Sequence, residues 1–83
     1  MEEMNVAKNI NIPLILLRIN DTAKIVMVKT GDTIKLRKLT AFGILPGLDV
    51  KVIQKYPAVV VQVGFTQIAL DEDIASEIIV QKS

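Results

Sequence analysis

The chain of 83 residues contains no cysteine, no histidine and no tryptophan. Without cysteine the fold can hold no disulfide, and thiol chemistry is excluded. Without histidine the chain lacks the usual general base at neutral pH and the commonest ligand of transition metals. A serine or threonine nucleophile needs an adjacent base. We therefore expect a protein that is not an enzyme and that carries no catalytic residue, no resident metal and no cofactor.

Aromatic residues and net charge are also scarce. The aromatic residues are Phe42, Tyr56 and Phe65, and ten basic side chains nearly cancel nine acidic ones to leave a net charge of +1. Base-stacking platforms need more rings than these. A chain with this charge balance also has no global field that attracts nucleic acid or anionic lipid. We therefore do not expect nucleic acid as a partner.

Long apolar runs are missing near the start of the chain. The run at 14–17 is Leu-Ile-Leu-Leu, whereas a membrane-spanning helix needs about 20 apolar residues. The chain begins with Met1, Glu2 and Glu3, and this acidic start is not typical of a signal peptide. These features predict a cytoplasmic protein that does not insert into a membrane.

The most informative segment is 36–47, which predicts a helix followed by two turns. Three large apolar residues recur at every third position and would share one helix face: Leu36, Leu39 and Phe42. Gly43 fits the left-handed position just past a helix end, because glycine has no Cβ to clash there. The Pro-Gly pair at 46–47 fits the centre of a type II turn.

Short segments on both sides of this helix predict strands. Alternating or β-branched residues mark five of them: 23–29, 49–55, 59–63, 66–70 and 78–80. Gly64 and Phe65 form a two-residue loop between the third and fourth, and glycine at the first loop position suits a type II′ turn. We expect a mainly β fold: a small, partly open barrel of about five short strands, with one α-helix after the first strand and a short helix or turn before the last.

The start of the chain predicts a boundary near residue 13. Residues 1–12 have no sustained hydrophobic period, so we expect a mobile amino-terminal lead there and a single domain over 13–82. The segment 13–17 predicts an opening turn or short strand packed on the barrel. Asn20 and Asp21 predict a turn, because both side chains can bond nearby backbone groups.

Helix starts are marked by short polar residues. Thr30 and Asp32 are both candidates for the N-cap of the central helix. Asp71, Glu72 and Asp73 form the one carboxylate cluster, for which there are two interpretations. Oxygen ligands suit a hard cation, but the same residues suit a capped helix start, where acidic side chains complement the helix dipole. We favour the helix start, because consecutive residues of a turn point in different directions.

Basic residues gather on the same central helix. Lys35, Arg37 and Lys38, with Lys29 nearby, could contact phosphate. The alternative is the solvated face of an amphipathic helix, which we favour because net charge is low and no aromatic residues are interleaved. Gly43 and the 46–47 turn follow the helix, whereas a phosphate loop precedes one.

Large aliphatic residues are more numerous than one small barrel needs. Those in excess lie in two segments: Leu14, Ile15, Leu16, Leu17, Ile44 and Leu45. Exposed apolar patches mark interaction sites, so part of this set could dock a partner. Any single residue of the set is more often core than surface.

From about Pro13 to Gln81 these motifs resemble, in order and spacing, the FeoA family, whose members accompany the bacterial ferrous iron transporter FeoB. The helix and turn follow the pattern Arg-x-Leu-x-x-x-Gly-x-x-Pro-Gly, carried here by Arg37, Leu39, Gly43, Pro46 and Gly47. The rest of the pattern is carried by Val50, Val52, Pro57, Ile68, Ala69, Leu70, Ala75, Ile78 and Val80. The family often has glycine in the early turn, where this chain has Asn20 and Asp21, and asparagine tolerates left-handed geometry.

The resemblance implies an SH3-like barrel and an accessory role in ferrous iron uptake, with the cytosolic region of FeoB as partner. The docking surface that we expect consists of apolar residues: Leu14, Leu16, Leu17, Leu39, Phe42, Ile44 and Leu45. Two alternatives stay open. The domain also resembles the carboxy-terminal SH3-like module of metal-dependent repressors of the diphtheria-toxin-repressor kind, and an RNA-binding SH3-like barrel is the third hypothesis.

Overall fold

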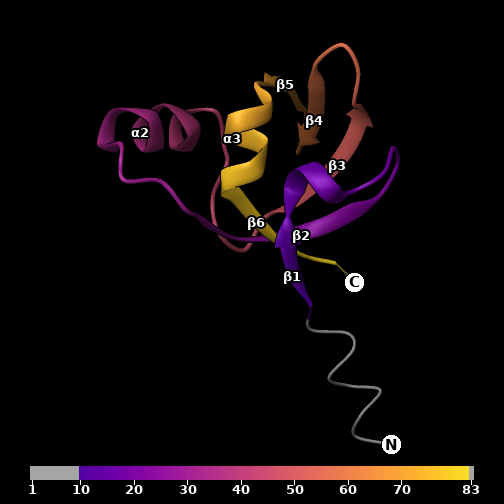
Figure 1. Cartoon of the computed structure of the whole chain (residues 1–83), viewed down its shortest axis with the longest axis horizontal. Coiled ribbons are helices and arrows are strands. Elements are labelled where there is room, and N and C mark those ends of the chain that lie inside the picture. The colour runs from indigo at the N-terminus through magenta and orange to yellow at the C-terminus, as the bar shows by residue number, and fades with distance from the viewer. Residues whose placement is uncertain (1–9, 83) are drawn as a thin grey trace, which may run out of the picture.

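Six strands form one antiparallel sheet that curls without closing (Figure 1). The structure, a computed structural model, describes residues 10–82. In chain order its elements are β1 (Asn11–Pro13), the 3-10 helix η1 (Leu14–Leu16), β2 (Thr22–Val28), α2 (Thr33–Ala41), β3 (Asp49–Gln54), β4 (Val59–Val63), β5 (Thr66–Leu70), α3 (Glu72–Glu77) and β6 (Ile78–Lys82). The sheet order is β1-β6-β2-β3-β4-β5, so β1 and β5 are its edges. The prediction of a mainly β, partly open fold is confirmed, with six strands in place of five.

The extra strand is β1. Asn11 pairs with Gln81 and Ile12 pairs with Val80, so these residues belong to the sheet. The predicted lead over 1–12 therefore ends too late, and its first nine residues lie outside the described part of the chain. A strand of three residues that ends at Pro13 is too short to show an alternating pattern, which is why the sequence did not reveal it.

Two bulges bend the sheet around a single core. The register between β2 and β6 shifts between Ile25 and Met27, and the register between β3 and β4 shifts between Val52 and Gln54. An extra residue in one strand bends it and increases its twist. The curl lets one face of all the long strands point inward.

The inward face is aliphatic throughout. In β4 every second residue is buried, namely Val59, Val61 and Val63, and the first two lie opposite buried Leu70 and Ile68 of β5. The other elements complete the core with Leu14, Leu17, Ala23, Ile25, Leu39, Ile44, Val50, Val52, Ala75, Ile78 and Val80. Among residues 10–82 no polar or charged side chain is buried. Burial of apolar surface, at about 25 cal/mol per Å², is therefore what holds this disulfide-free domain together.

The hairpin between β4 and β5 has the predicted two-residue loop. Val63 pairs with Thr66, and Gly64 between them has a φ of +61°. A positive φ at the first loop residue and an ordinary φ at Phe65 are the pattern of a type II′ turn. The prediction is confirmed.

The predicted turn at Asn20 and Asp21 is also present. Asn20 has a φ of +75°, and its N–H donates to the carbonyl of Val52 at 2.7 Å. The backbone N–H of Arg18 donates to the Asp21 carboxylate at 2.9 Å, and Lys82 Nζ lies 3.3 Å from the same group. The pKa of Asp21 is lowered chiefly by the hydrogen bond from Arg18 and then by Lys82. Asn20 thus adopts the left-handed backbone that asparagine tolerates better than most residues with a side chain.

Among the described residues, no helix combines the length and the apolar character that crossing a membrane requires. The longer helix, α2, has nine residues, whereas about 20 apolar residues are needed to span the hydrocarbon core.

Candidate partner-binding surface

Helix α2 begins at a well-formed N-cap. The Asp32 carboxylate accepts hydrogen bonds from the backbone N–H groups of Ile34 at 3.0 Å and Lys35 at 3.1 Å. Thr30 Oγ1 in turn accepts from the N–H of Asp32 at 3.1 Å. Of the two candidates for this cap, Asp32 occupies the position and Thr30 supports it. Two of the four unpaired N–H groups of the first turn are therefore satisfied.

The carboxyl end of α2 is closed by a Schellman motif. Gly43 has a φ of +95°, and its N–H donates to the carbonyl of Thr40 at 3.0 Å. The N–H of Ile44 donates to the carbonyl of Leu39 at 2.9 Å. This motif usually brings two apolar side chains together at the helix end, and here Leu39 and Ile44 are both buried in the core.

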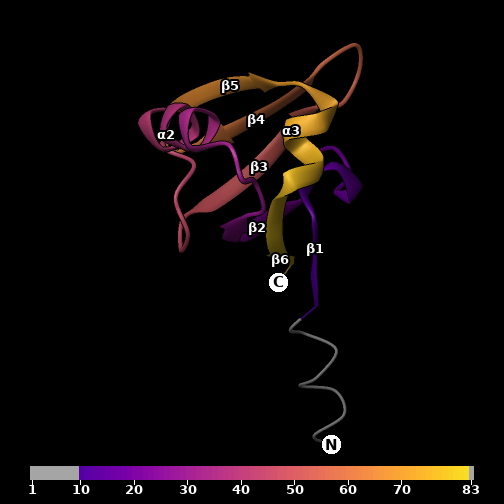
Figure 2. The ribbon, with the colours of Figure 1, turned by 60° about the vertical axis from the view of Figure 1, so that its left-hand side comes forward.

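The apolar face of α2 is mostly exposed. Leu36 and Phe42 flank Leu39 on the face predicted from the sequence, but they are 39% and 54% exposed, and only Leu39 among the nine helix residues is buried. Figures 1 and 2 show α2 beside the sheet at one end of the molecule. One side chain therefore anchors this helix to the core, while the rest of its apolar face meets solvent.

The turn after α2 is fixed to β2. Gly47 has a φ of +94°, and the N–H of Leu48 donates to the carbonyl of Leu45 at 3.2 Å, which confirms the predicted type II turn. The N–H of Gly47 donates to the carbonyl of Ile25, and the N–H of Ile25 donates to the carbonyl of Leu48. These bonds connect the turn to β2, while Leu45 and Leu48 stay partly exposed.

A shallow groove of about 420 Å³ lies where the end of α2 meets the tip of the β4–β5 hairpin. Its lining residues are Phe42, Gly43, Leu48, Asp49, Val63, Gly64 and Thr66. A Cβ on Gly43 would lie 3.9 Å from Val63 Cγ1, so the helix end and the hairpin are in contact. We call this groove, together with exposed Leu36 and Leu45, the α2 surface.

The structure corrects the expected docking residues. Four of the seven, Leu14, Leu17, Leu39 and Ile44, are buried in the core and cannot contact a partner. Leu14 begins η1 and Leu17 follows its last residue, and both are buried, while Leu39 and Ile44 are the apolar pair of the Schellman motif. Leu16, Phe42 and Leu45 are exposed, and for them docking stays a prediction.

These three exposed residues do not form one surface. Phe42 and Leu45 adjoin α2, whereas Leu16 belongs to η1, and α3 lies between η1 and α2 in both views (Figures 1 and 2). Lys55 Nζ donates to the carbonyl of Ile15 at 2.9 Å, which ties the β3–β4 loop to the η1 side. The single apolar surface predicted from sequence is therefore divided between two sides of the domain.

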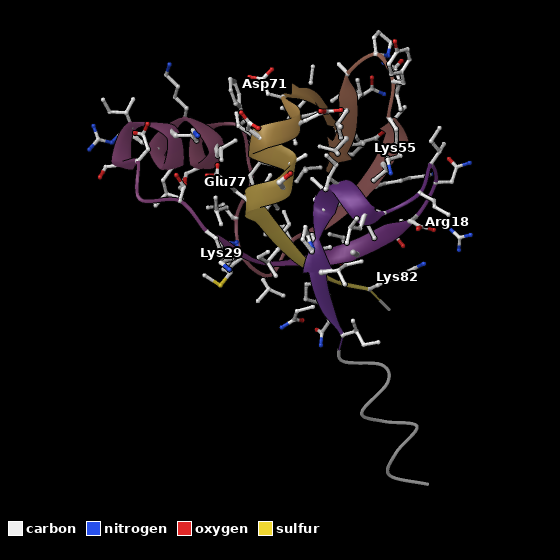
Figure 3. The ribbon with its side chains drawn as sticks, in the orientation of Figure 1. Arg18, Lys29, Lys55, Asp71, Glu77 and Lys82 are labelled. Atoms are coloured by element: carbon white, nitrogen blue, oxygen red, sulfur yellow. The ribbon has the colours of Figure 1, made fainter. Side chains whose placement is uncertain are left out.

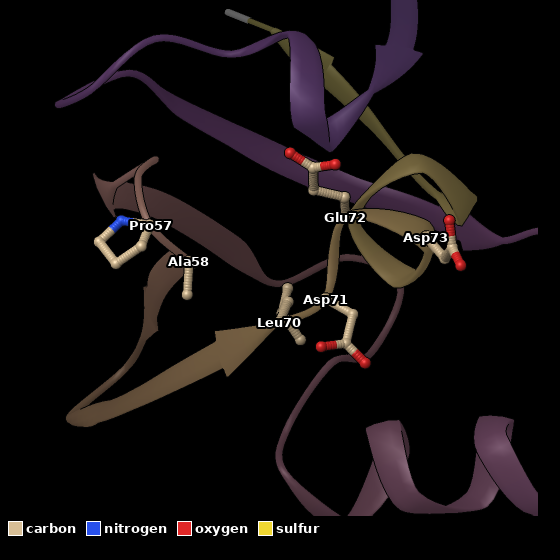
Figure 4. A pocket seen from close by; sticks show the side chains of 6 residues that line it. All are labelled: Pro57, Ala58, Leu70, Asp71, Glu72 and Asp73. Atoms are coloured by element: carbon tan, nitrogen blue, oxygen red, sulfur yellow. The ribbon is translucent and has the colours of Figure 1, made fainter.

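The acidic cluster opens α3, as expected, but without the expected cap bond. Asp71 occupies the N-cap position, yet its carboxylate accepts no capping hydrogen bond. Asp71, Glu72 and Asp73 line a shallow pocket of about 370 Å³ with Pro57, Ala58 and Leu70. Figure 4 shows their three carboxylates pointing in different directions. Within residues 10–82 no three acidic residues converge as metal ligands would.

The basic residues of α2 are partly paired. Lys35 Nζ lies 3.3 Å from Glu77 Oε1, and the two side chains are 32% and 31% exposed. The N–H of Lys29 donates to the carbonyl of Glu77 at 2.7 Å, and Figure 3 shows Lys29 and Glu77 on the same side of α3. Lys35 thus links α2 to α3, which leaves Arg37 and Lys38 as the exposed cations of this helix.

Sequence reasoning missed two residues of this region. Phe65 is fully exposed and Leu48 is 42% exposed. The exposure of Phe65 had a signal in the sequence, because the second residue of a two-residue hairpin loop always lies at the tip. Leu48 gave no such signal, since its position depends on how the turn is fixed to β2.

The curled six-stranded sheet defines an SH3-like domain, and comparisons with known proteins support this class. The structure resembles Stenotrophomonas maltophilia FeoA in complex with zinc, with a TM-score of 0.73, 28% identity, and coverage of 82% of this chain and 87% of that one. That protein is described as a prokaryotic SH3 domain protein and as a candidate activating factor for bacterial ferrous iron transport.

The family follows from the sequence match. The FeoA domain family matches residues 12–82, and the chain belongs to this family of accessory iron-transport proteins. A crystal structure of an iron uptake regulatory protein, also a FeoA, shares the fold with a TM-score of 0.80 at 23% identity, and the match covers 89% of this chain and 99% of that one. No curated protein matches the chain.

The same fold occurs inside larger repressors. The structure resembles T. acidophilum IdeR with a TM-score of 0.82 and 27% identity, over 88% of this chain but only 34% of that one. The chain thus spans about one third of the repressor that it matches.

Proposed function

We propose that this chain is a non-enzymatic accessory protein of ferrous iron uptake that binds the cytosolic region of FeoB through the α2 surface. Membership of the FeoA family supports the iron-transport context. We choose this surface because the apolar face of α2 is exposed beside a groove. Two residues that line the groove, Phe42 and Leu48, are 54% and 42% exposed. Contiguous exposed apolar residues mark interaction sites.

Binding alone would not change transport. A partner shifts an equilibrium between two states only to the extent that it binds one state more tightly than the other. We propose that the α2 surface distinguishes between states of the FeoB GTPase cycle or gate. The protein would then act in the cytoplasm, at the inner face of the membrane where FeoB lies.

The test is capture of FeoB from lysate of the source cell by the tagged full chain, with and without a non-hydrolysable GTP analogue. Leu45→Glu places a charge on the α2 surface at a residue that is already 39% exposed. We expect it to lower FeoB recovery at least tenfold, since a desolvated unpaired charge costs more than the roughly 1.4 kcal/mol that a tenfold change represents.

The matched control is Leu16→Glu, which makes the same change on the η1 side at a residue that is 63% exposed. It is expected to leave FeoB recovery unchanged. Loss of recovery with Leu16→Glu alone would place docking on η1 and reject the α2 surface. Recovery that depends on the nucleotide analogue would support a regulatory role.

A second candidate function has one observation in its favour. The similarity to the T. acidophilum IdeR structure at 27% identity is consistent with a stand-alone relative of the repressor module. Recovery of a repressor without FeoB in the same experiment would favour this candidate. Recovery of RNA would favour the RNA-binding alternative, although the pairing of Lys35 with Glu77 reduces the basic surface available to phosphate.

A further inference from the structure

The outer edge of β5 is an open hydrogen-bonding template. In the β4–β5 ladder Val63 pairs with Thr66 across the two-residue loop, and this closing pair is hydrogen-bonded. Because hydrogen-bonded and non-hydrogen-bonded pairs alternate, Gln67 and Ala69 direct their N–H and C=O groups away from β4. Within residues 10–82 no strand or backbone hydrogen bond reaches these groups from that side.

The two edges of the sheet differ in how well they are protected. The other edge, β1, has three residues and ends at Pro13, which cannot donate a hydrogen bond. Strand β5 has five residues, Thr-Gln-Ile-Ala-Leu, without proline, charge or bulge. Proteins commonly protect exposed edges with those three features. Gln67 and Ala69 are exposed, and within residues 10–82 no further strand pairs with this edge.

The ends of the β5 edge have opposite character. At its start Phe65 is fully exposed at the hairpin tip. At its end Asp71, Glu72 and Asp73 follow directly, and Figure 4 shows the Asp71 side chain projecting where the β5 arrow ends. None of the ion pairs within residues 10–82 involves these three carboxylates. The edge therefore runs from an apolar end to an acidic end.

We propose that β5 accepts an extended segment of a partner protein as a seventh strand of the sheet. Main-chain hydrogen bonds to Gln67 and Ala69 supply the pairing, as in other cases of strand addition. The segment is uncharged in its middle, carries a lysine or arginine at the end that meets Asp71–Asp73, and carries an apolar residue at the end that meets Phe65. These two anchors lie about six residues apart, the separation of Phe65 from Asp71.

A second copy of this chain fits the edge poorly. Antiparallel pairing about a two-fold axis at Ile68 would place Gln67 opposite Ala69 of the second copy. The same register would place Phe65 opposite Asp71 of the second copy at both ends. An apolar ring would then face a carboxylate twice, which a partner with the opposite order of anchors avoids. The proposal does not depend on the α2 surface or on FeoB.

The test uses the full chain and a synthetic octapeptide, Lys-Lys-Thr-Val-Thr-Val-Thr-Leu, with Glu-Glu replacing Lys-Lys in the matched probe. Hydrogen exchange of backbone amides is followed by NMR. At a free peptide concentration ten times Kd, the amides of Gln67 and Ala69 should exchange about tenfold more slowly, because only about a tenth of the edge stays free. The Glu-Glu peptide should give no protection at the same concentration.

Two variants separate edge pairing from other binding. Ala69→Pro removes an N–H that faces away from β4, a place where proline is tolerated in an edge strand, and it should weaken binding at least tenfold while Ala69→Val leaves it unchanged. Charge reversal by the double change Asp71→Lys and Asp73→Lys should reverse the preference, so that the Glu-Glu peptide binds better. That second test stays valid if Ala69→Pro proves unstable.

Three results would overturn the proposal. The first is peptide binding that protects amides of α2 or β1 and not those of Gln67 and Ala69. The second is an unchanged peptide preference after charge reversal. The third is protection of the two amides by the protein alone as its concentration rises, which would assign the edge to a second copy.

Discussion

The two α-helices within residues 10–82 each bury one residue but differ in their capping and in their contacts with other elements. The six-residue helix α3 contributes Ala75 to the core, contacts η1 and β1, and has no side-chain hydrogen bond at its N-cap. The nine-residue helix α2 has one buried residue, Leu39, and capping hydrogen bonds at both ends. Short helices are marginal on their own, so α3 depends on packing, whereas α2 depends on its end groups and one anchor.

This difference has a functional consequence. Helix α3 has two apolar residues, of which Ala75 is buried and Ile74 is partly buried against the core, so it offers little apolar surface to a partner. A helix held at its ends keeps its face free, and α2 leaves Leu36 and Phe42 exposed beside the groove. This difference favours α2 as the recognition element, and it can be tested by variants that alter one helix and leave the other unchanged.

The largest effect should come from the single anchor of α2. Leu39→Ala removes a side chain that is 3% exposed and should lower the free energy of unfolding by about 2–5 kcal/mol through lost burial and a residual cavity. Leu36→Ala, on the same helix face but partly exposed, should cost less than about 1 kcal/mol. Urea denaturation followed by circular dichroism measures both. Equal losses of unfolding free energy would mean that Leu36 is packed as closely as Leu39, which would contradict their different exposure in the structure.

The next effect tests the carboxyl end of α2. Gly43→Ala places a Cβ on a residue with a φ of +95°, although the space there is open, with Val63 Cγ1 at 3.9 Å. The left-handed backbone should cost about 1–2 kcal/mol for a residue with a side chain. Gly31→Ala is the control, since Gly31 has no positive φ and no atom within 4 Å of its Cβ position. A neutral Gly43→Ala would contradict the role given to the Schellman motif.

The sequence predicted the glycine turns correctly and narrowed the N-cap of α2 to Thr30 or Asp32, because these features depend on local backbone conformation. Asp32 at the N-cap, Gly43 past the helix end and the positive φ of Gly47 and Gly64 each follow from what a residue type can adopt or donate. Turns and caps involve residues within five positions of one another. A single sequence therefore contains most of the information that fixes them.

Burial could not be predicted in the same way. Leu36, Leu39 and Phe42 have equivalent spacing, yet only Leu39 meets the core, because the path of the chain after Gly43 decides how far α2 lies from the sheet. The strand β1 depends likewise on residues about 70 positions away, through the pairing of Asn11 with Gln81. The placement of Leu16 and Phe42 on two sides of the domain also depends on the tertiary structure. The candidate surface could therefore not be located from the sequence alone.

A smaller effect separates the N-termini of the two helices. Asp32→Ala removes the acceptor of two backbone N–H groups and should cost about 1 kcal/mol. Asp71→Ala makes the same change at the α3 N-cap, where the carboxylate accepts no capping bond, and should stay within about 0.5 kcal/mol. Thermal denaturation of both variants at neutral pH measures the difference. Equal costs would show that Asp71 caps α3 in solution.

The smallest effect concerns the ion pair that joins the two helices. Lys35 Nζ and Glu77 Oε1 are 3.3 Å apart, and each side chain is about one third exposed. Partly solvated pairs of this kind contribute about 0.2–1 kcal/mol, and salt screens them. Lys35→Gln and Glu77→Gln, with the double variant, form a cycle whose coupling energy should fall in that range and shrink in 1 M salt. The backbone bond from Lys29 to the carbonyl of Glu77 is unaffected by these changes. A coupling energy of zero at low salt would mean that Leu39 and the end groups alone position α2, which would strengthen the contrast between the two helices.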